Sequence, residues 1–166
     1  MANVNVNELL ARCVEIEKAA MAALSPTVAA DAVPYFIHVQ ESFPYFTNRI
    51  GNIEIGFDSN EMDRDTYTVV IRLVVAHVTS GFVGAVETDL YTYIPAIITA
   101  FNQNEGLQSV AYPDAMTDLI EGENDRVISC TGFRTLEDGG LQGVKQVCAE
   151  FILTCLFNQD LDLFNL

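Results

Sequence analysis

Residues 66–78, with the sequence Thr66-Tyr-Thr-Val-Val-Ile-Arg-Leu-Val-Val-Ala-His-Val78, decide the fold of this chain. Side chains alternate between the two faces of a β-strand, so every second residue lies on the same face. The odd positions form one unbroken apolar set: Tyr67, Val69, Ile71, Leu73 and Val75. We therefore expect a long strand with one fully buried face. The even positions mix threonine and arginine with valine and alanine, so the second face is either covered by another subunit or exposed.

The segment after Ser80-Gly81 changes from strand spacing to helix spacing. Apolar residues recur every three or four positions, as in one helical stripe: Val86, Leu90, Ile94, Ile97 and Phe101. This helix should pack on the odd face of the strand. Pro95 lacks a backbone N–H and clashes with the preceding turn, which predicts a kink or a break near residues 91–94. The polar residues 102–106 end in Gly106, which favours helix termination.

A first helix is predicted over about residues 6–24. Asn5 and Glu8 have the spacing of a capping box at its start, and Pro26 ends it. Its apolar stripe consists of Leu10, Cys13, Val14, Ala20, Met21 and Leu24. Three charged residues fall outside this stripe and are expected at the surface: Arg12, Glu15 and Lys18.

Residues 33–57 are rich in aromatic and β-branched side chains and are interrupted by prolines, which predicts short strands at the sheet edge. The expected strands are Tyr35–Gln40, Tyr45–Ile50 and Ile53–Phe57, with Gly51-Asn52 as a two-residue turn between the last two. Residues 58–65 should then form a polar, acidic loop. A calcium site is not expected there, because Met62 and Asp63 stand where a calcium loop needs a ligand and a glycine.

The C-terminal half contains two further strand patterns, Arg126–Leu136 and Gly143–Phe157, joined through the hairpin signal of residues 137–140. Residues 107–124 are expected to be irregular. The sequence thus predicts a single α+β domain, with a mainly antiparallel sheet of about four or five strands and two principal helices packed on one face. The tail 158–166 extends from it and carries four large apolar residues that are candidates for contacts in an assembly: Leu161, Leu163, Phe164 and Leu166.

Composition excludes several classes of protein. The formal net charge is −15, with a pI near 4.2, which argues against nucleic-acid wrapping and against binding to anionic membranes, since both need basic patches. No apolar run approaches the roughly 18 residues of a membrane span, and the N-terminus lacks a secretory signal pattern. Four cysteines without metal-binding spacing are expected to be reduced and unmetallated: Cys13, Cys130, Cys148 and Cys155.

No catalytic motif occurs in the sequence. His38 and His77 both lie in strand patterns, and we interpret each as a packed or surface residue rather than a base. We therefore predict no enzymatic activity, no cofactor and no metal. A small intracellular enzyme or ligand-binding domain remains the alternative class, and it would need a concave pocket with converging polar groups.

The order of elements, together with three passages of sequence, resembles the tail terminator proteins of tailed bacteriophages. The passages are Asp65-Thr-Tyr-Thr-Val-Val-Ile-Arg-Leu73, Tyr93-Ile-Pro-Ala-Ile-Ile98 and Phe101-Asn-Gln-Asn-Glu-Gly-Leu107. The resemblance implies a structural virion protein that is made in the bacterial host cytoplasm. It implies a homo-oligomeric ring, typically a hexamer, that caps the tail tube, ends its polymerisation and joins it to the neck or head connector. A head–tail completion (neck) protein or another tail ring subunit is the alternative within this group.

The resemblance also implies a set of partners. These are further copies of the chain, the tail tube protein and the neck or head–tail connector protein, while DNA passes through the ring without specific binding. Two acidic segments, 58–65 and 114–125, would then create a strongly negative local field. We expect at least one of them to face the lumen or the tube-facing rim, and the candidate residues in the first are Asp58, Glu61, Asp63 and Asp65.

Overall fold

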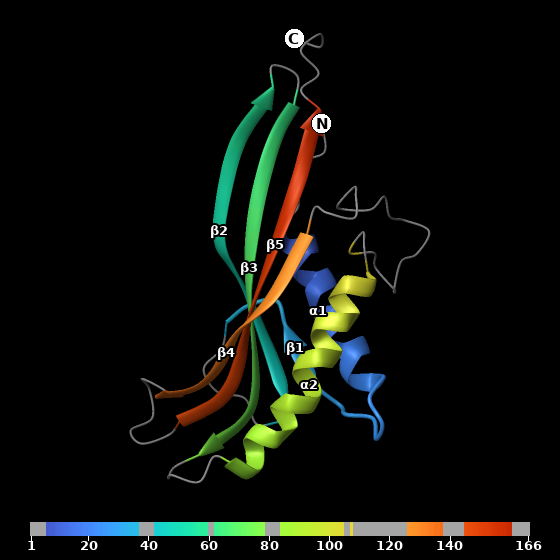
Figure 1. Cartoon of the computed structure of the whole chain (residues 1–166), viewed down its shortest axis with the longest axis vertical. Helices are drawn as coiled ribbons and strands as arrows, with labels where there is room; N and C mark the ends of the chain where they lie inside the picture. Colours follow the sequence, from blue (N-terminus) through green and yellow to red (C-terminus); the bar gives the residue numbers. More distant parts are fainter. Residues whose placement is uncertain are drawn as a thin grey trace.

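The computed structural model describes residues 6–36, 42–59, 62–78, 84–104, 107, 126–137 and 145–160 (Figure 1). These residues form two helices and five strands. In chain order they are α1 (Val6–Ala22), β1 (Asp31–Val33), β2 (Tyr45–Ser59), β3 (Met62–Val78), α2 (Gly84–Gln103), β4 (Arg126–Glu137) and β5 (Lys145–Asp160). The predicted α+β fold is confirmed. Within the described ranges, no helix is long and apolar enough to cross a membrane.

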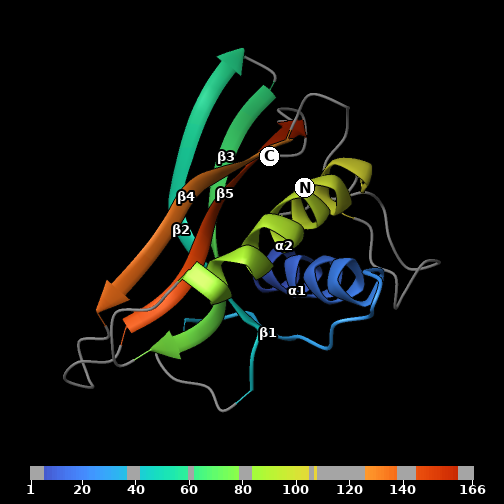
Figure 2. The ribbon, with the colours of Figure 1, turned by 60° about the horizontal axis from the view of Figure 1, so that its bottom comes forward.

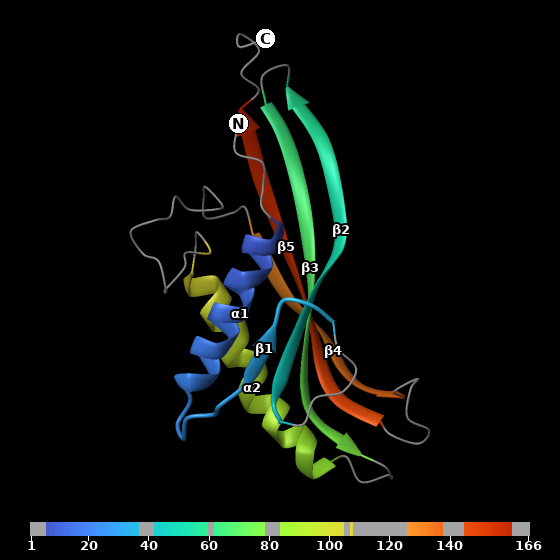
Figure 3. The ribbon, with the colours of Figure 1, turned by 180° about the vertical axis from the view of Figure 1, so that it is seen from behind.

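The strands form one sheet in the order β1-β2-β3-β5-β4. All neighbouring strands are antiparallel except β1, which pairs in parallel with residues 45–47 of β2. The two helices lie side by side on one face of the sheet, as Figures 2 and 3 show from two directions. This arrangement confirms the prediction of a mainly antiparallel sheet with both helices on one face.

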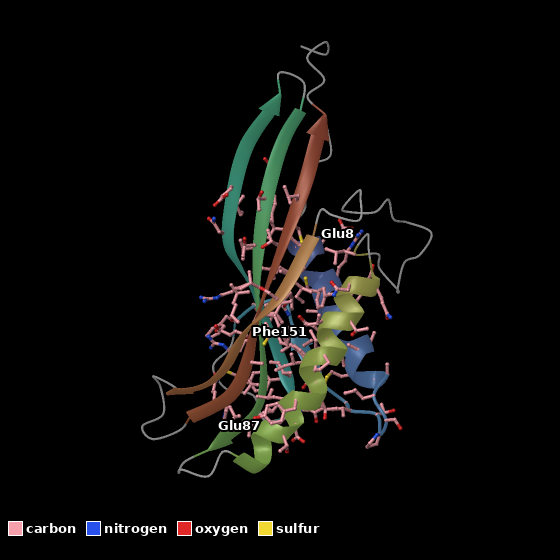
Figure 4. All side chains as sticks on the ribbon, in the orientation of Figure 1. Glu8, Glu87 and Phe151 are labelled. Carbon is pink, nitrogen blue, oxygen red and sulfur yellow. The ribbon has the colours of Figure 1, made fainter. Side chains whose placement is uncertain are left out.

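The core lies between the helices and the odd face of β3. Side chains at the odd positions of β3 from Tyr67 to Val75 are at most 9% exposed, as the alternation predicts. Three residues of the predicted stripe of α2 are fully buried against them: Leu90, Ile97 and Phe101. Phe151 of β5 lies at the centre of this layer in Figure 4 and is also fully buried. The two longest strands and α2 therefore bury one another's apolar faces.

Arg12 corrects the prediction for the first helix. We expected it at the surface, but its side chain is only 2% exposed. Its guanidinium donates hydrogen bonds to the backbone carbonyl of Leu107 and to the Glu8 carboxylate, each at 2.7 Å. A buried charge is tolerated when it is paired and hydrogen-bonded. Arg12 thus ties α1 to the chain just after the end of α2.

Pro95 does not break α2, which continues from Gly84 to Gln103. Of the two predicted outcomes near residues 91–94, the break is therefore wrong, and the kink stays a prediction. Pro95 itself is exposed. The helix ends three residues before Gly106, which lies outside the described residues.

Gly51-Asn52 does not form a turn. Strand β2 runs unbroken for 15 residues, and its register with β3 shifts between Ile50 and Asn52. A Cβ atom on Gly51 would lie 2.8 Å from Cγ2 of Val70, so the glycine allows a β-bulge against β3. The predicted strand Tyr35–Gln40 is not seen at Tyr35 and Phe36, and residues 37–40 lie outside the described part of the chain.

Candidate assembly surface

Three strands extend beyond the helices as an arm. We define the arm as residues 54–59 of β2, 62–66 of β3 and 156–160 of β5, which pair with one another beyond the first residue of β4. Figure 1 shows these strands continuing past both helices. Ile53 at the base of the arm is 44% exposed, and Ile55 within it is 70% exposed. The arm therefore presents apolar side chains with no helix over them.

Ile53 and Ile55 lie on the same face of the sheet that the two helices cover over the core. Ile53 pairs with Tyr67 of β3, and Ile55 pairs with Asp65. Tyr67 belongs to the buried odd face, and directly paired residues on neighbouring strands point to the same side of a sheet. The exposed isoleucines thus continue the core face into a region where this chain supplies no covering element among its described residues.

Within the acidic segment 58–65, residues 58, 59 and 62–65 belong to strands of this arm rather than to a loop. Asp58 belongs to β2, and Asp63 and Asp65 belong to β3, where residues from Met62 onward pair with both β2 and β5. The loop prediction is wrong for these residues because backbone pairing on both sides holds β3 extended whatever the polarity of its side chains. Glu61 lies outside the described residues.

We expected Asp65 to be exposed at the lumen or the tube-facing rim of a ring, but within this chain it is buried. Its side chain is buried, with 7% exposure, on the helix-side face of β3. Burial raises the pKa of the neighbouring Tyr67 hydroxyl, and the negative charge of Asp65 raises it further. Among the four acidic candidates, the structure thus brings Asp58, Asp63 and Asp65 into one arm and buries the last of them.

The C-terminal candidates Leu161, Leu163, Phe164 and Leu166 lie outside the described residues. Strand β5 ends at Asp160, whose partner on β3 is Met62 at the end of the arm. The chain therefore continues toward its C-terminus from the tip of the arm, and a role for these apolar residues in assembly stays a prediction.

The face of the sheet opposite the helices carries a charged pair. Arg72 contacts the Glu150 carboxylate through Nη2 at 2.7 Å and Nε at 3.2 Å. Phe36 covers this pair, with its ring centroid 4.8 Å from Cζ of Arg72 and 5.6 Å from Cζ of Arg49. The segment after β1 therefore covers part of the second face, which we expected to be either exposed or covered by another subunit.

His77 is a packed residue in a polar cluster at one end of the sheet. Its Nε2 lies 3.2 Å from the Tyr45 hydroxyl and 3.5 Å from the Gln146 amide nitrogen. Phe43 packs edge-on against the imidazole ring at 4.9 Å. This geometry agrees with the packed-residue interpretation of His77, while His38 lies outside the described residues.

Glu17 and Asn48 form a buried polar pair that the sequence analysis did not identify. The Asn48 amide donates hydrogen bonds to the Glu17 carboxylate at 3.0 Å and to the Val33 carbonyl at 3.2 Å. Burial raises the pKa of Glu17 well above its usual range, while the bond from Asn48 and the charge of Lys18 oppose this shift. The signal was present in the sequence: Glu17 lies four residues after Cys13 and four before Met21, within the apolar stripe of α1.

An open groove of about 330 Å³ lies between the two helices. Its lining residues are mostly small and apolar, and none carries a titratable side chain: Ala20, Ala23, Leu24, Pro95, Ala96, Thr99, Ala100 and Gln103.

All four cysteines are free thiols; three are buried and Cys130 is half-buried. Burial raises the pKa of Cys13, and the nearby Glu17 carboxylate raises it further.

The groove and the polar clusters bring together few groups with catalytic or ligand-binding chemistry. Across the ranges that the structure describes, no three His, Cys, Asp or Glu side chains are placed to hold a metal ion. The exposed apolar side chains of the arm and its base are thus the feature that best indicates a protein-binding surface. In comparisons with known proteins, no protein-family model matches this chain, and no curated protein matches it significantly.

Proposed function

We propose that this chain is a structural subunit that assembles with copies of itself into a ring, and that the ring caps the tail tube of a bacteriophage. The observation that carries the proposal is the arm and its base, where Ile55 and Ile53 are exposed on the side that forms the core elsewhere in the sheet. An exposed apolar surface that continues a core face marks a site of protein association.

The phage tail assignment combines this arm with the resemblance described above. Part of the element order that carries the resemblance recurs in the fold, as α1, β3, α2 and the paired strands β4 and β5, whereas the single strand β2 replaces the expected short strands. On this proposal, a hexameric ring ends tube polymerisation, contacts the tail tube protein and provides the joint to the neck or head–tail connector in the virion.

The acidic character of the chain fits passage of DNA through such a ring. The net charge is −15, and Asp58 and Asp63 belong to the arm. A negative lumen repels phosphate groups and keeps the duplex from adhering. The proposal includes no enzymatic activity and no cofactor.

The test is the native mass of the protein alone and in the presence of assembled tail tubes. The wild-type chain should form a closed oligomer, and it should bind tube ends and stop their growth. Substituting both Ile53 and Ile55 with serine should raise the protein concentration needed for half-maximal assembly at least tenfold, because it removes exposed apolar surface from the arm and its base.

Tyr91→Ser is the matched control, because Tyr91 is 58% exposed but lies on α2, away from the arm. Its assembly should equal that of the wild type. A wild-type chain that stays monomeric even with assembled tubes contradicts the proposal.

A further inference from the structure

We use the term row for four residues that pair one after another across β2, β3, β5 and β4. Over the same five rows, neither edge of the sheet has a further strand beside it among the described residues. On one edge, β1 covers only residues 45–47 of β2, which leaves Asn48 onward without a neighbouring strand among the described residues. On the other edge, β4 begins at Arg126, which pairs with Cys155 of β5. Following the partners across the sheet gives five rows with two open ends: Asn48 with Cys130, Arg49 with Ser129, Ile50 with Ile128, Asn52 with Val127 and Ile53 with Arg126.

Strand directions make these two edges complementary. Three antiparallel steps separate β2 from β4, so the two edge strands run in opposite directions. A second copy placed beside the first without a shift along the strands therefore brings β4 of one copy antiparallel to β2 of the next. Such a head-to-tail contact is heterologous, and it forms a ring when the rotation between copies closes.

Neither edge strand contains the two residue types that most directly block pairing at an edge. Exposed edges are commonly blocked by lysine or proline, and β2 and β4 contain neither residue. Strand β2 has two register shifts, at Gly51 and between Phe57 and Ser59, and β4 has one between Cys130 and Gly132. Only the shift at Gly51 lies within the five rows, where it adds a single residue on the β2 side. Among the described residues, no strand pairs with the outer edge of β2 or β4 over the five rows, which leaves room for a strand of another copy.

The two edge strands differ in net charge over their full lengths, although each segment within the five rows contains a single charged residue, Arg49 in β2 and Arg126 in β4. In a chain of net charge −15, β4 contains two arginines and one glutamate and is net positive. Strand β2 contains one arginine, one glutamate and one aspartate and is net negative. Opposite charges on neighbouring strands stabilise a sheet, whereas like charges destabilise it. In the unshifted head-to-tail arrangement, Arg49 lies opposite Ser129 and Arg126 lies opposite Ile53, so the two arginines do not oppose each other directly.

We propose that copies of this chain associate edge to edge, with residues 126–130 of β4 in one copy pairing antiparallel with residues 48–53 of β2 in the next, so that the sheet continues from copy to copy. This inference rests on the proposed self-assembly and names the surface that carries it. The arm then stands at the end of each intersubunit seam, because Ile53 belongs to the last of the five rows.

Cysteine cross-linking between copies tests the pairing. Arg49 and Ser129 are both exposed and occupy opposite ends of one row. Within one chain they are separated by three strand spacings, about 14 Å, which no disulfide spans. We would purify Arg49→Cys and Ser129→Cys separately in a Cys130→Ser background, mix them and oxidise the mixture. The mixture should give a covalent dimer in high yield, and a chain with both substitutions should give a ladder of covalent oligomers.

The controls separate this inference from the proposed function. Arg49→Cys with Thr99→Cys, an exposed position on α2, should give no ladder. Cross-linking of Arg49→Cys to itself would instead show two-fold pairing of β2 and overturn the inference. A chain with the native mass of an oligomer but no cross-link between positions 49 and 129 assembles through another surface, which overturns the inference alone. A chain that neither cross-links nor associates with tubes overturns both proposals.

Discussion

The Asn48 side chain on β2 donates a 3.0 Å hydrogen bond to the Glu17 carboxylate on α1, and neither residue is exposed to solvent. The second carboxylate oxygen of Glu17, Oε1, has no hydrogen-bond partner among the described residues. A carboxyl group in this position is more easily accommodated in its neutral form, because desolvation disfavours the charged form. The contact between helix and sheet is therefore sensitive to protonation.

Glu17→Gln should change how stability depends on pH. The pKa of Glu17 is raised in the folded state above its ordinary value of 4.5, so the folded chain holds this proton where the unfolded chain has released it. The free energy of unfolding therefore falls as pH rises from about the ordinary value toward the raised one. Glutamine cannot ionise, so the variant should lose less stability over this range than the wild type. Urea unfolding midpoints across the acid-to-neutral range measure the difference, and parallel profiles would show that Glu17 does not titrate in this way.

Gly51→Ala should destabilise the protein by about 1–3 kcal/mol, the usual cost of an overpacked site. The new Cβ would lie 2.8 Å from Cγ2 of Val70, and a valine side chain cannot swing away from it as a long flexible chain could. Adding Val70→Ala should recover much of this loss, because it removes the opposing methyl group. A double-mutant cycle by urea unfolding checks the coupling, and strictly additive costs would contradict the steric explanation.

Phe101→Ala should cost about 3–5 kcal/mol, as expected for the loss of a buried aromatic side chain. Phe101 is fully buried between α2 and the sheet. Thr92→Ala on the exposed side of the same helix is the control and should change stability by less than about 0.5 kcal/mol. Equal effects of the two substitutions, measured by chemical denaturation, would be inconsistent with the packing described.

Neutralising the acidic segment should separate folding from assembly. Asp58→Asn, Glu61→Gln and Asp63→Asn together should leave the unfolding midpoint near that of the wild type and alter assembly or DNA passage. Adding Asp65→Asn should lower the midpoint, because Asp65 is buried in β3 and participates in interactions within the fold. Thermal unfolding and particle assembly are the two measurements. If the triple variant forms fully infectious particles, the charge of the arm has no role in assembly.

The parts of the fold that the sequence predicted correctly are those with a long, uninterrupted period. Strand β3 and helix α2 each carry one, and their buried residues follow from it. The failure at Gly51 has a physical reason: a glycine followed by asparagine permits both a hairpin turn and a bulge, and only the long partner strand β3 decides between them. β1 has three residues and no period of its own, so it depends on the edge of β2 to exist.

The candidate site was less predictable than the fold. Acidic side chains at residues 58–65 suggested a loop, because polarity is a correlate of loops, whereas strand pairing is a property of the backbone. The open rows of the sheet depend on where β1 ends and β4 begins, and strand boundaries are the least certain feature of any sequence pattern. The burial of Arg12 and Glu17 could not be predicted, because it depends on hydrogen-bond partners that are distant in the sequence.

Strand β3 spans two regions that differ in local stability. Residues 67–75 lie over the core, and opening their hydrogen bonds to solvent requires most of the protein to unfold. Residues 62–66 have strands on both sides but no helix above them in Figure 1, so their hydrogen bonds can open by fraying from the tip of the arm. The rate of amide hydrogen exchange should therefore fall by orders of magnitude from residues 62–66 to residues 67–75 of this one continuous strand. Binding of a partner to the arm would slow exchange at the tip and leave the core residues of the same strand unchanged.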